Sequence, residues 1–285
     1  MPHSGINVVD EASKPKLNVR RSHYDANYSN FQTSLYEQVR RDAFGEDIGQ
    51  NSWLTATEQD SFFRKWLSLS PGKSLLDVAC GAGGPALRVA ATTGASVIGV
   101  DIHEQAVATA SALAVERGLA ERAEFRVIDA ALQLPFPDGS FDAITCIDAI
   151  NHFPDRSCVI TEWRRLLKPT GRLLFTDPVV VTGPLTNAEI AIRGSAGFYL
   201  FVPHGYDQDT LKRCGMRVVA LENVSQNTAV IAERRKTARA ARALALREIE
   251  GEEAYERQQD FLTLASRLAK EGRLSRFLFV AEKLS

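Results

Sequence analysis

The chain has 285 residues, of which 45% are hydrophobic and 24% charged, and its formal net charge at pH 7 is -1. This length suits one large domain or one domain with a cap, and the composition is that of an ordinary globular protein. The near-neutral charge argues against a general nucleic-acid-binding protein, which would normally be basic. We find no signal segment and no apolar run of the roughly 20 residues that cross a bilayer.

Four cysteines are scattered along the chain, without a CxxC pair or the spacing of a zinc site: Cys80, Cys146, Cys158 and Cys214. The first three lie in or near apolar runs and are expected to be buried free thiols. We therefore expect no metal and a location in the reducing cytoplasm.

The first 70 residues divide into two parts. Residues 1–20 are polar, lack periodicity and are expected to form a flexible tail. Aromatic residues recur through residues 21–70, glycines interrupt this stretch, and a helix is predicted over residues 57–67. Because this piece precedes the strand-and-helix region, we expect it to lie over that region as an N-terminal helical lid.

A short apolar strand over residues 74–79 is followed by a glycine turn containing Gly81, Gly83 and Gly84. Pro85 opens a helix that ends near Gly94, and proline is favourable in the first turn of a helix. Glycines let the backbone turn tightly and approach a ligand, while the N–H groups of the helix start face that ligand.

Strands and helices then alternate, which predicts a parallel sheet covered on both faces. Strands are expected over residues 96–100, 124–128, 143–147 and 172–176, and helices over 104–117 and 155–168. Residues 71–182 would form this core. The strands are followed by acidic residues, and ligands of open parallel sheets bind at the carboxyl ends of the strands: Asp101, Asp129, Asp148 and Asp177.

Residues 183–206 break this rhythm with a segment rich in glycine and aromatic residues, GSAGFYLFVPHGY. We expect it to be a cap inserted after the fifth strand. Residues 207–285 would complete the sheet, with a short helix over 209–214, a strand over 216–224, helices over 232–250 and 254–270, and a closing strand over 276–282.

Several motifs together resemble the class I S-adenosylmethionine-dependent methyltransferases. LLDVACGAGG, IGVDI, LPFPDGSFDAI and WRRLLKPTGRLL, at residues 75–84, 98–102, 134–144 and 163–174, resemble the motifs of that superfamily. HYD at residues 23–25 and GEDIGQNSW at 45–53 are most similar to its small-molecule group of sarcosine/dimethylglycine, sterol and aminosugar enzymes. The resemblance implies a Rossmann-like, doubly wound α/β sheet of seven strands whose last strand is antiparallel.

The resemblance also implies S-adenosylmethionine as cofactor and S-adenosylhomocysteine as product. Asp101 would hold the ribose hydroxyls, Asp129 would accept from the adenine amine, and Asp148 would lie near the sulfonium. The residues that it implies for cofactor binding are Tyr24, Trp53, Asp77, Ala79, Gly81, Gly83, Asp101, Ile102, Asp129, Ala130 and Asp148.

Methyl transfer is an in-line displacement, in which the protein mainly aligns the acceptor and excludes water. A base is needed only where the acceptor must lose a proton. His152 and Asp148 are the candidate catalytic residues, and His204 in the cap is a second candidate base; substrate orientation and loop structure are the alternatives for His152. The candidate substrate-binding residues are mostly aromatic: Tyr28, Phe198, Tyr199, Phe201, His204 and Tyr206.

Three alternatives to a small-molecule methyltransferase remain open. The glycine turn satisfies the loose GxGxxG/A pattern, so an NAD(P)-dependent oxidoreductase is one alternative. A nucleic-acid methyltransferase would carry an Asn/Asp-Pro-Pro-aromatic motif, whereas residues 148–153 read DAINHF. A catalytically inactive cofactor-binding protein is the third. We expect a small metabolite with an apolar part as methyl acceptor, no nucleic acid or membrane partner, and a monomer or homodimer.

Overall fold

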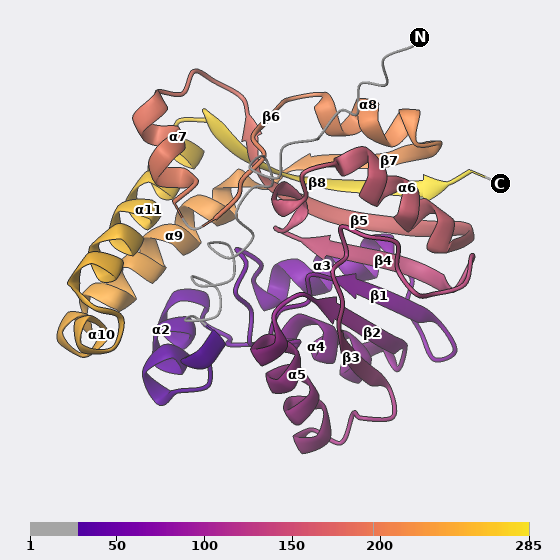
Figure 1. The fold of residues 1–285 in the computed structure, drawn as a ribbon, viewed down its shortest axis with the longest axis horizontal. Helices are drawn as coiled ribbons and strands as arrows, with labels where there is room; N and C mark the ends of the chain where they lie inside the picture. The colour runs from indigo at the N-terminus through magenta and orange to yellow at the C-terminus, as the bar shows by residue number, and fades with distance from the viewer. Residues whose placement is uncertain (1–27, 196, 285) are drawn as a thin grey trace, which may run out of the picture.

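The computed structural model describes residues 28–195 and 197–284, which form a central sheet flanked by helices (Figure 1). The parallel strands are β1 (Ser74–Val78), β2 (Ser96–Asp101), β3 (Ala123–Val127), β4 (Phe141–Ile147) and β5 (Leu167–Val181). They are followed by β6 (Val202–Pro203), β7 (Met216–Asn223) and β8 (Leu274–Lys283).

The main path through the sheet runs β3-β2-β1-β4-β5-β8-β7, and the two-residue β6 pairs with β5 off this path. Strand β8 is antiparallel to both β5 and β7. The predicted α/β sheet with an antiparallel last strand is therefore confirmed, with β6 as a short additional strand within the predicted cap.

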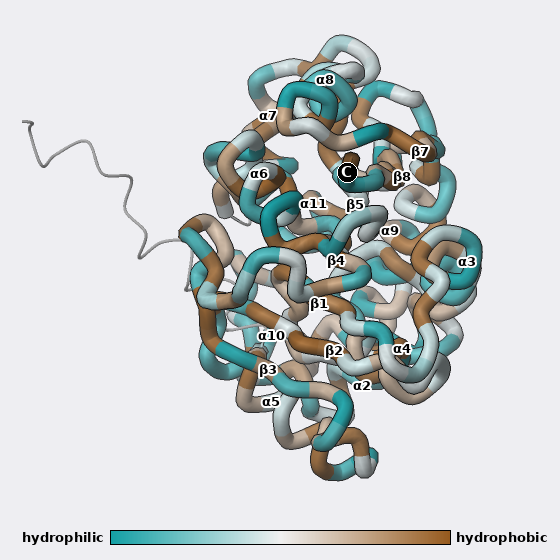
Figure 2. The backbone as a smooth tube through the Cα atoms, turned by 90° about the vertical axis from the view of Figure 1, so that its right-hand side faces the viewer, coloured by the Kyte–Doolittle hydropathy of each residue, from teal (hydrophilic) through white to brown (hydrophobic). Residues whose placement is uncertain are grey.

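Alternation along the strands explains why helices cover both faces. Leu76 of β1 belongs to one buried cluster and its neighbour Leu75 to another, and the same alternation separates Leu173 from Leu174 in β5. Successive side chains of a strand point to opposite faces, so each face needs its own cover. The tube in Figure 2 is coloured as hydrophobic along β1 and β2, as strands that are buried on both faces should be.

Helix α6 (Arg156–Leu166) and helix α8 (Tyr206–Arg213) supply side chains to the first cluster. The second cluster takes side chains from α3 (Ala56–Trp66), α4 (Gly84–Thr93) and α5 (Glu104–Glu116). Asp155 caps α6 by accepting a hydrogen bond from the backbone of Cys158, which fixes where this helix begins.

A further group of helices lies to one side of the sheet (Figure 1). It contains α2 (Ser34–Phe44) from the predicted lid, α7 (Asn187–Arg193) from the predicted cap, and α9 (Ser225–Ala240), α10 (Ala243–Glu250) and α11 (Glu252–Lys270). Helix α9 contacts α2 and α11. The single helix predicted over residues 232–250 is wrong, because the chain forms two helices that meet at Ala241 and Arg242.

The thiols differ from the expectation at one position. Cys80 and Cys146 are buried, but Cys158 is exposed in the first turn of α6, next to its cap residue Asp155. All four cysteines are free. Within residues 28–195 and 197–284, no helix combines the length and the apolar character that a membrane crossing requires.

Candidate active site

The glycine turn is fastened to the end of β2. The backbone N–H of Gly81 donates to Oδ2 of Asp101 at 2.8 Å, and that of Cys80 donates to the carbonyl of Val100 at 3.1 Å. Gly83 has a φ of +76°, and a Cβ there would lie 2.6 Å from that of Ala110. The turn thus depends on glycine both for its backbone conformation and for its close packing on α5.

Residues 48–49 of the predicted lid pack directly on this turn. A Cβ on Gly84 would lie 1.8 Å from the carbonyl oxygen of Ile48 and 2.8 Å from the backbone of Gly49. Only a residue without a side chain allows the two backbones to approach so closely. The chain just before Trp53 is therefore held against the start of α4.

A cavity of about 350 Å³ opens beside this turn, at the carboxyl ends of the parallel strands. Its walls come from the lid, the glycine turn, the segments after β2, β3 and β4, and the cap. The lining residues that carry polar or ionisable side chains are Tyr28, Asn51, Ser52, Asp77, Cys80, Asp101, His103, Asp129, Asp148 and His152. The remaining residues are glycine or apolar: Gly49, Ala79, Gly81, Ala82, Pro85, Val100, Ile102, Ile128, Ala130, Ala131, Ile147, Ala149, Phe153, Pro154, Gly197 and Phe198.

Asp77 is a buried carboxyl group near the end of β1. Its Oδ1 accepts a hydrogen bond from the hydroxyl of Thr145 at 2.7 Å, and its other oxygen has no hydrogen-bond partner among the described residues. Burial raises the pKa of Asp77 to about 7; the negative charge of Asp101 adds to this rise and the Thr145 hydroxyl opposes it. A ligand cation would favour the ionised form of this group.

Asp101 is the last residue of β2, and Asp129 lies two residues beyond the end of β3. Asp101 accepts from the backbone of Gly81 and, at 3.0 Å, from that of His103, while burial raises its pKa. Oδ1 of Asp129 accepts from the backbone of Ala131 at 2.9 Å. Both carboxyl groups therefore order their own loops as well as line the cavity.

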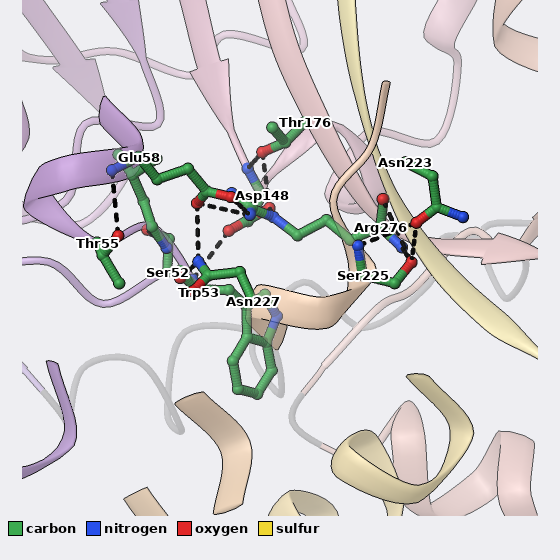
Figure 3. A network of polar contacts seen from close by, with 11 residues as sticks. Ser52, Trp53, Thr55, Glu58, Asp148, Thr176, Asn223, Ser225, Asn227 and Arg276 are labelled. Atoms are coloured by element: carbon green, nitrogen blue, oxygen red, sulfur yellow. Dashed lines mark hydrogen bonds and ion pairs between the residues drawn. The ribbon is translucent and has the colours of Figure 1, made fainter. Parts of the chain in front are cut away.

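Asp148, after β4, has a left-handed backbone with a φ of +54°. Its Oδ1 accepts from the Thr176 hydroxyl at 2.6 Å and lies 2.6 Å from Nε of Arg276, while its Oδ2 accepts from the backbone N–H of Trp53 at 2.9 Å (Figure 3). The carboxylate is thus paired with a buried arginine. Its expected place near the sulfonium, as a candidate catalytic residue beside His152, stays a prediction.

The predicted cap lines the cavity with Gly197 and Phe198 and contacts His152, which follows β4. Nδ1 of His152 lies 2.8 Å from the carbonyl oxygen of Phe198, and its ring meets the Tyr199 ring edge-on with centroids 4.8 Å apart. The backbone N–H of Leu200 also donates to the carbonyl of Asn151 at 2.8 Å. The segment after β4 and the cap therefore form one wall of the cavity.

Several residues predicted for the site lie elsewhere. The Trp53 ring stacks on Phe261 of α11, with centroids 6.2 Å apart, and does not line the cavity. Gly83 packs on α5 instead, and His204 is exposed and contacts Phe277. Tyr199, Phe201 and Tyr206 are partly buried beside the core and not at the cavity wall, whereas Tyr24 lies outside the described residues.

The structure also brings unpredicted residues to the site. Asn51 and Ser52 line the cavity from the GEDIGQNSW segment. Arg276 reaches Asp148 from β8, 128 residues along the chain. An arginine at the start of the otherwise apolar run RFLFVA was the signal that could have drawn attention to it.

The fold and the site define a Rossmann-like, cofactor-binding enzyme. A family model described as a methyltransferase domain matches residues 76–175. The 27-O-demethylrifamycin SV methyltransferase of Amycolatopsis mediterranei is 31% identical over 219 residues, covering 76% of this chain and 80% of the relative. The chain belongs to the class I S-adenosylmethionine-dependent methyltransferases, in the group that acts on small molecules.

Other relatives share a smaller part of their length. Sterol 24-C-methyltransferase ERG6B of Gibberella zeae is 36% identical over 151 residues, covering 50% of this chain but 38% of the relative. The fold matches that of the cyclopropane synthase MmaA2 from Mycobacterium tuberculosis, with a TM-score of 0.78 at 20% identity over 95% of this chain and 100% of the other. Family membership decides against the oxidoreductase alternative.

The cofactor of the enzyme is S-adenosylmethionine, and the cavity residues fit this molecule chemically. Asp77 offers a carboxylate oxygen to an ammonium group, and Asp101 and Asp129 offer acceptors to hydroxyl and amine donors. Apolar side chains after β2 and β3 provide surfaces for a flat ring: Ile102, Ile128 and Ala130. A methyl-bearing cation also suits a cavity that carries several carboxylates.

Proposed function

We propose that the enzyme methylates a hydroxyl group of a small, uncharged molecule with an apolar body. The observation that carries this proposal is the composition of the cavity wall. The described residues that line the cavity include His152 and many apolar groups, but neither lysine nor arginine. A phosphorylated or carboxylated acceptor would call for such a cation.

In this proposal the cofactor half of the cavity uses the residues that line it. Asp77 binds the cofactor's amino group, with Ala79 and Gly81 beside it, and Asp101 binds the ribose hydroxyls. Asp129 accepts from the adenine amine, with Ile102 and Ala130 against the ring. Tyr28 and Phe198 form the cavity wall around the methyl acceptor.

His152 is the proposed general base. A carbonyl oxygen can only accept, so the contact with Phe198 places the proton of neutral His152 on Nδ1 and the lone pair on Nε2, which lies 3.4 Å from Nδ2 of Asn151. When bound, the cofactor supplies a methyl group on a sulfonium for in-line displacement. His152 removes the hydroxyl proton of the acceptor, while the lid and the cap exclude water. The name of the 27-O-demethylrifamycin SV relative supports an oxygen acceptor.

The proposal includes the organisation of the chain. Residues 21–70 act as the lid, residues 71–182 as the cofactor-binding core, residues 183–206 as the cap, and residues 207–285 complete the sheet. The enzyme acts in the cytoplasm as a monomer or homodimer, without nucleic acid. The free cysteines support the cytoplasmic location, and the net charge of -1 supports the absence of a nucleic-acid partner.

The experiment is a screen of paired acceptors with purified enzyme and S-adenosylmethionine, read by mass spectrometry. Each apolar alcohol or phenol is compared with its phosphate ester and its amine analogue. Preferential methylation of the neutral hydroxyl compounds supports the proposal. Methylation of the phosphorylated or amine analogues contradicts it, and cofactor binding without turnover on any acceptor favours the catalytically inactive alternative.

A further inference from the structure

A buried arginine links the cavity to the lid. The side chain of Arg276 in β8 is 0% exposed, and its Nε lies 2.6 Å from Oδ1 of Asp148. Its Nη1 lies 2.9 and 2.8 Å from the two carboxylate oxygens of Glu58, in the first turn of α3 (Figure 3). One guanidinium thus holds together β8, the end of β4 and α3.

Asp148 passes this restraint to the backbone of the lid. While Oδ1 faces Arg276, Oδ2 accepts from the N–H of Trp53 at 2.9 Å. The carbonyl of Trp53 accepts from Asn227 at 2.9 Å, and the same amide group donates to Glu58 at 2.9 Å. The backbone at Trp53 is therefore held on both sides, directly after Asn51 and Ser52, which line the cavity.

The geometry depends on a guanidinium. Arginine presents several donors in a rigid fork, so it can engage two carboxylates from different directions, whereas the ammonium of lysine is a compact point charge. Without Arg276, Asp148 would be a buried carboxylate that has lost its cation. Such a group reorients towards water or takes up a proton, and either change weakens its hydrogen bond to Trp53.

The cost of removing two charges from water often offsets their attraction in a buried ion pair. A contribution to fold stability is therefore not enough to explain the pair of Arg276 and Asp148. Asp148 lines the cavity, and its φ of +54° is unusual for a residue other than glycine. A strained residue at a cavity wall persists only where its surroundings fix it, and Arg276, Thr176 and Trp53 supply that restraint.

We propose that Arg276 is a positioning residue of the cofactor site, which holds the Asp148 carboxylate so that it docks the lid backbone at Trp53 against the cavity. Arg276 acts through Asp148 and does not itself line the cavity. The effect on cofactor binding rests on the proposed function, whereas the contact with the lid does not.

The test combines two measurements on Arg276→Gln, Arg276→Lys and Asp148→Asn. Hydrogen exchange of the Trp53 amide without ligand reports the lid contact, with the Leu76 amide in β1 as a reference for global unfolding. Calorimetry with S-adenosylhomocysteine reports the cofactor site. We expect Arg276→Gln to weaken both Trp53 protection and ligand affinity by about tenfold or more, the size of one charge-assisted hydrogen bond.

Three further results are expected if Arg276 acts through Asp148. The double variant Arg276→Gln/Asp148→Asn should lose no more Trp53 protection and no more ligand affinity than the weaker of its two single variants. Both substitutions remove the same restraint. Arg276→Lys, which keeps the charge but loses the fork, should fall between wild type and Arg276→Gln. Glu58→Gln keeps the contact between Arg276 and Asp148, so it should weaken Trp53 protection less than Arg276→Gln does.

Arg156→Gln is the matched control, because Arg156 is equally buried and pairs with two carboxylates elsewhere in the fold. It should lower stability without a selective rise in Trp53 exchange.

Unchanged S-adenosylhomocysteine affinity in Arg276→Gln overturns the proposal, as does an equal effect of Arg156→Gln on Trp53. If Arg276→Gln does not fold, the same two measurements on Asp148→Asn and Arg276→Lys test the proposal, and unchanged S-adenosylhomocysteine affinity in both overturns it. If wild type binds no cofactor, the proposed function fails, while the Trp53 amide still tests the lid contact.

Discussion

Nδ1 of His152 lies 2.8 Å from the backbone carbonyl oxygen of Phe198, so the backbone of the predicted cap holds the imidazole in place. This one hydrogen bond sets the tautomer of the neutral ring and ties the segment after β4 to the cap. A substrate that displaced the cap would therefore also release the histidine.

Replacing His152 separates catalysis from cofactor binding. We expect His152→Gln to lower kcat/KM by about 10²- to 10⁴-fold and to remove the acidic limb of the pH profile, because the base is lost. Affinity for S-adenosylhomocysteine should be retained. His204→Gln is the matched control, since His204 is exposed and outside the cavity. Full turnover of His152→Gln at every pH would remove this residue as the base.

Cofactor affinity should depend on pH through Asp77. Burial raises the pKa of this carboxyl group to about 7, so most of it is protonated at pH 6 and ionised at pH 8. If the carboxylate binds the cofactor's ammonium group, S-adenosylhomocysteine affinity rises by about tenfold between these pH values. Calorimetry of Asp77→Asn should show weak and pH-independent binding; parallel pH profiles for variant and wild type would contradict the assignment.

The same group affects stability. The folded protein retains a proton on Asp77 that the unfolded chain loses near pH 4. The free energy of unfolding should therefore fall as the pH rises from about 4 to 7, and this part of the pH dependence should be absent in Asp77→Asn. Denaturation curves at fixed ionic strength measure it.

The sheet could be predicted from the sequence because its signals are local. Apolar runs of five to seven residues, the glycine turn and the helix-ending glycines place β1 to β4 within one or two residues of the structure. Ligands of parallel sheets bind at the carboxyl ends of the strands, and this rule predicts that Asp101, Asp129 and Asp148 lie at one edge. In the structure all three line the same cavity.

The partners of these residues could not be predicted. The contact of Asp148 with Arg276 joins residues 128 positions apart. Nothing local in the sequence indicates it, or the hydrogen bond that Asp148 accepts from the backbone of Trp53. The aromatic residues of the lid and the cap could face either the cavity or the core. Trp53 faces α11 because Phe261 offers it a stacking surface, a fact that only the packing of α2, α9 and α11 decides.

Gly84→Ala tests how the lid is seated. Its methyl group would collide with the carbonyl of Ile48, so the lid must move or α4 must shift. We expect a loss of about 1–3 kcal/mol in the free energy of unfolding and faster hydrogen exchange at residues 48–50. Gly118→Ala is the comparison variant, because no atom lies within 4 Å of a Cβ built at Gly118 and the substitution adds only backbone strain. Unchanged exchange at residues 48–50 would show that the close approach does not hold the lid.

Arg156→Met tests the second buried ion cluster. Arg156 pairs with Asp177 in β5 and with Asp207 in α8, and it donates to the carbonyl of Leu200 in the predicted cap. Its loss leaves two buried carboxyl groups without a cation, so we expect a loss of about 3–5 kcal/mol on chemical denaturation. Arg217→Met, at an exposed pair with Glu282, should cost under about 1 kcal/mol. Equal losses in the two variants would contradict the account.

The cavity beside the glycine turn is the expected binding site of S-adenosylmethionine. Calorimetric titration with S-adenosylmethionine and S-adenosylhomocysteine, with NAD and NADP as controls, tests it most directly in wild type and Asp101→Ala. We expect both sulfur compounds to bind wild type, Asp101→Ala to weaken their binding strongly, and neither dinucleotide to bind. Binding of NAD, or equal affinity of Asp101→Ala and wild type for S-adenosylmethionine, would contradict it.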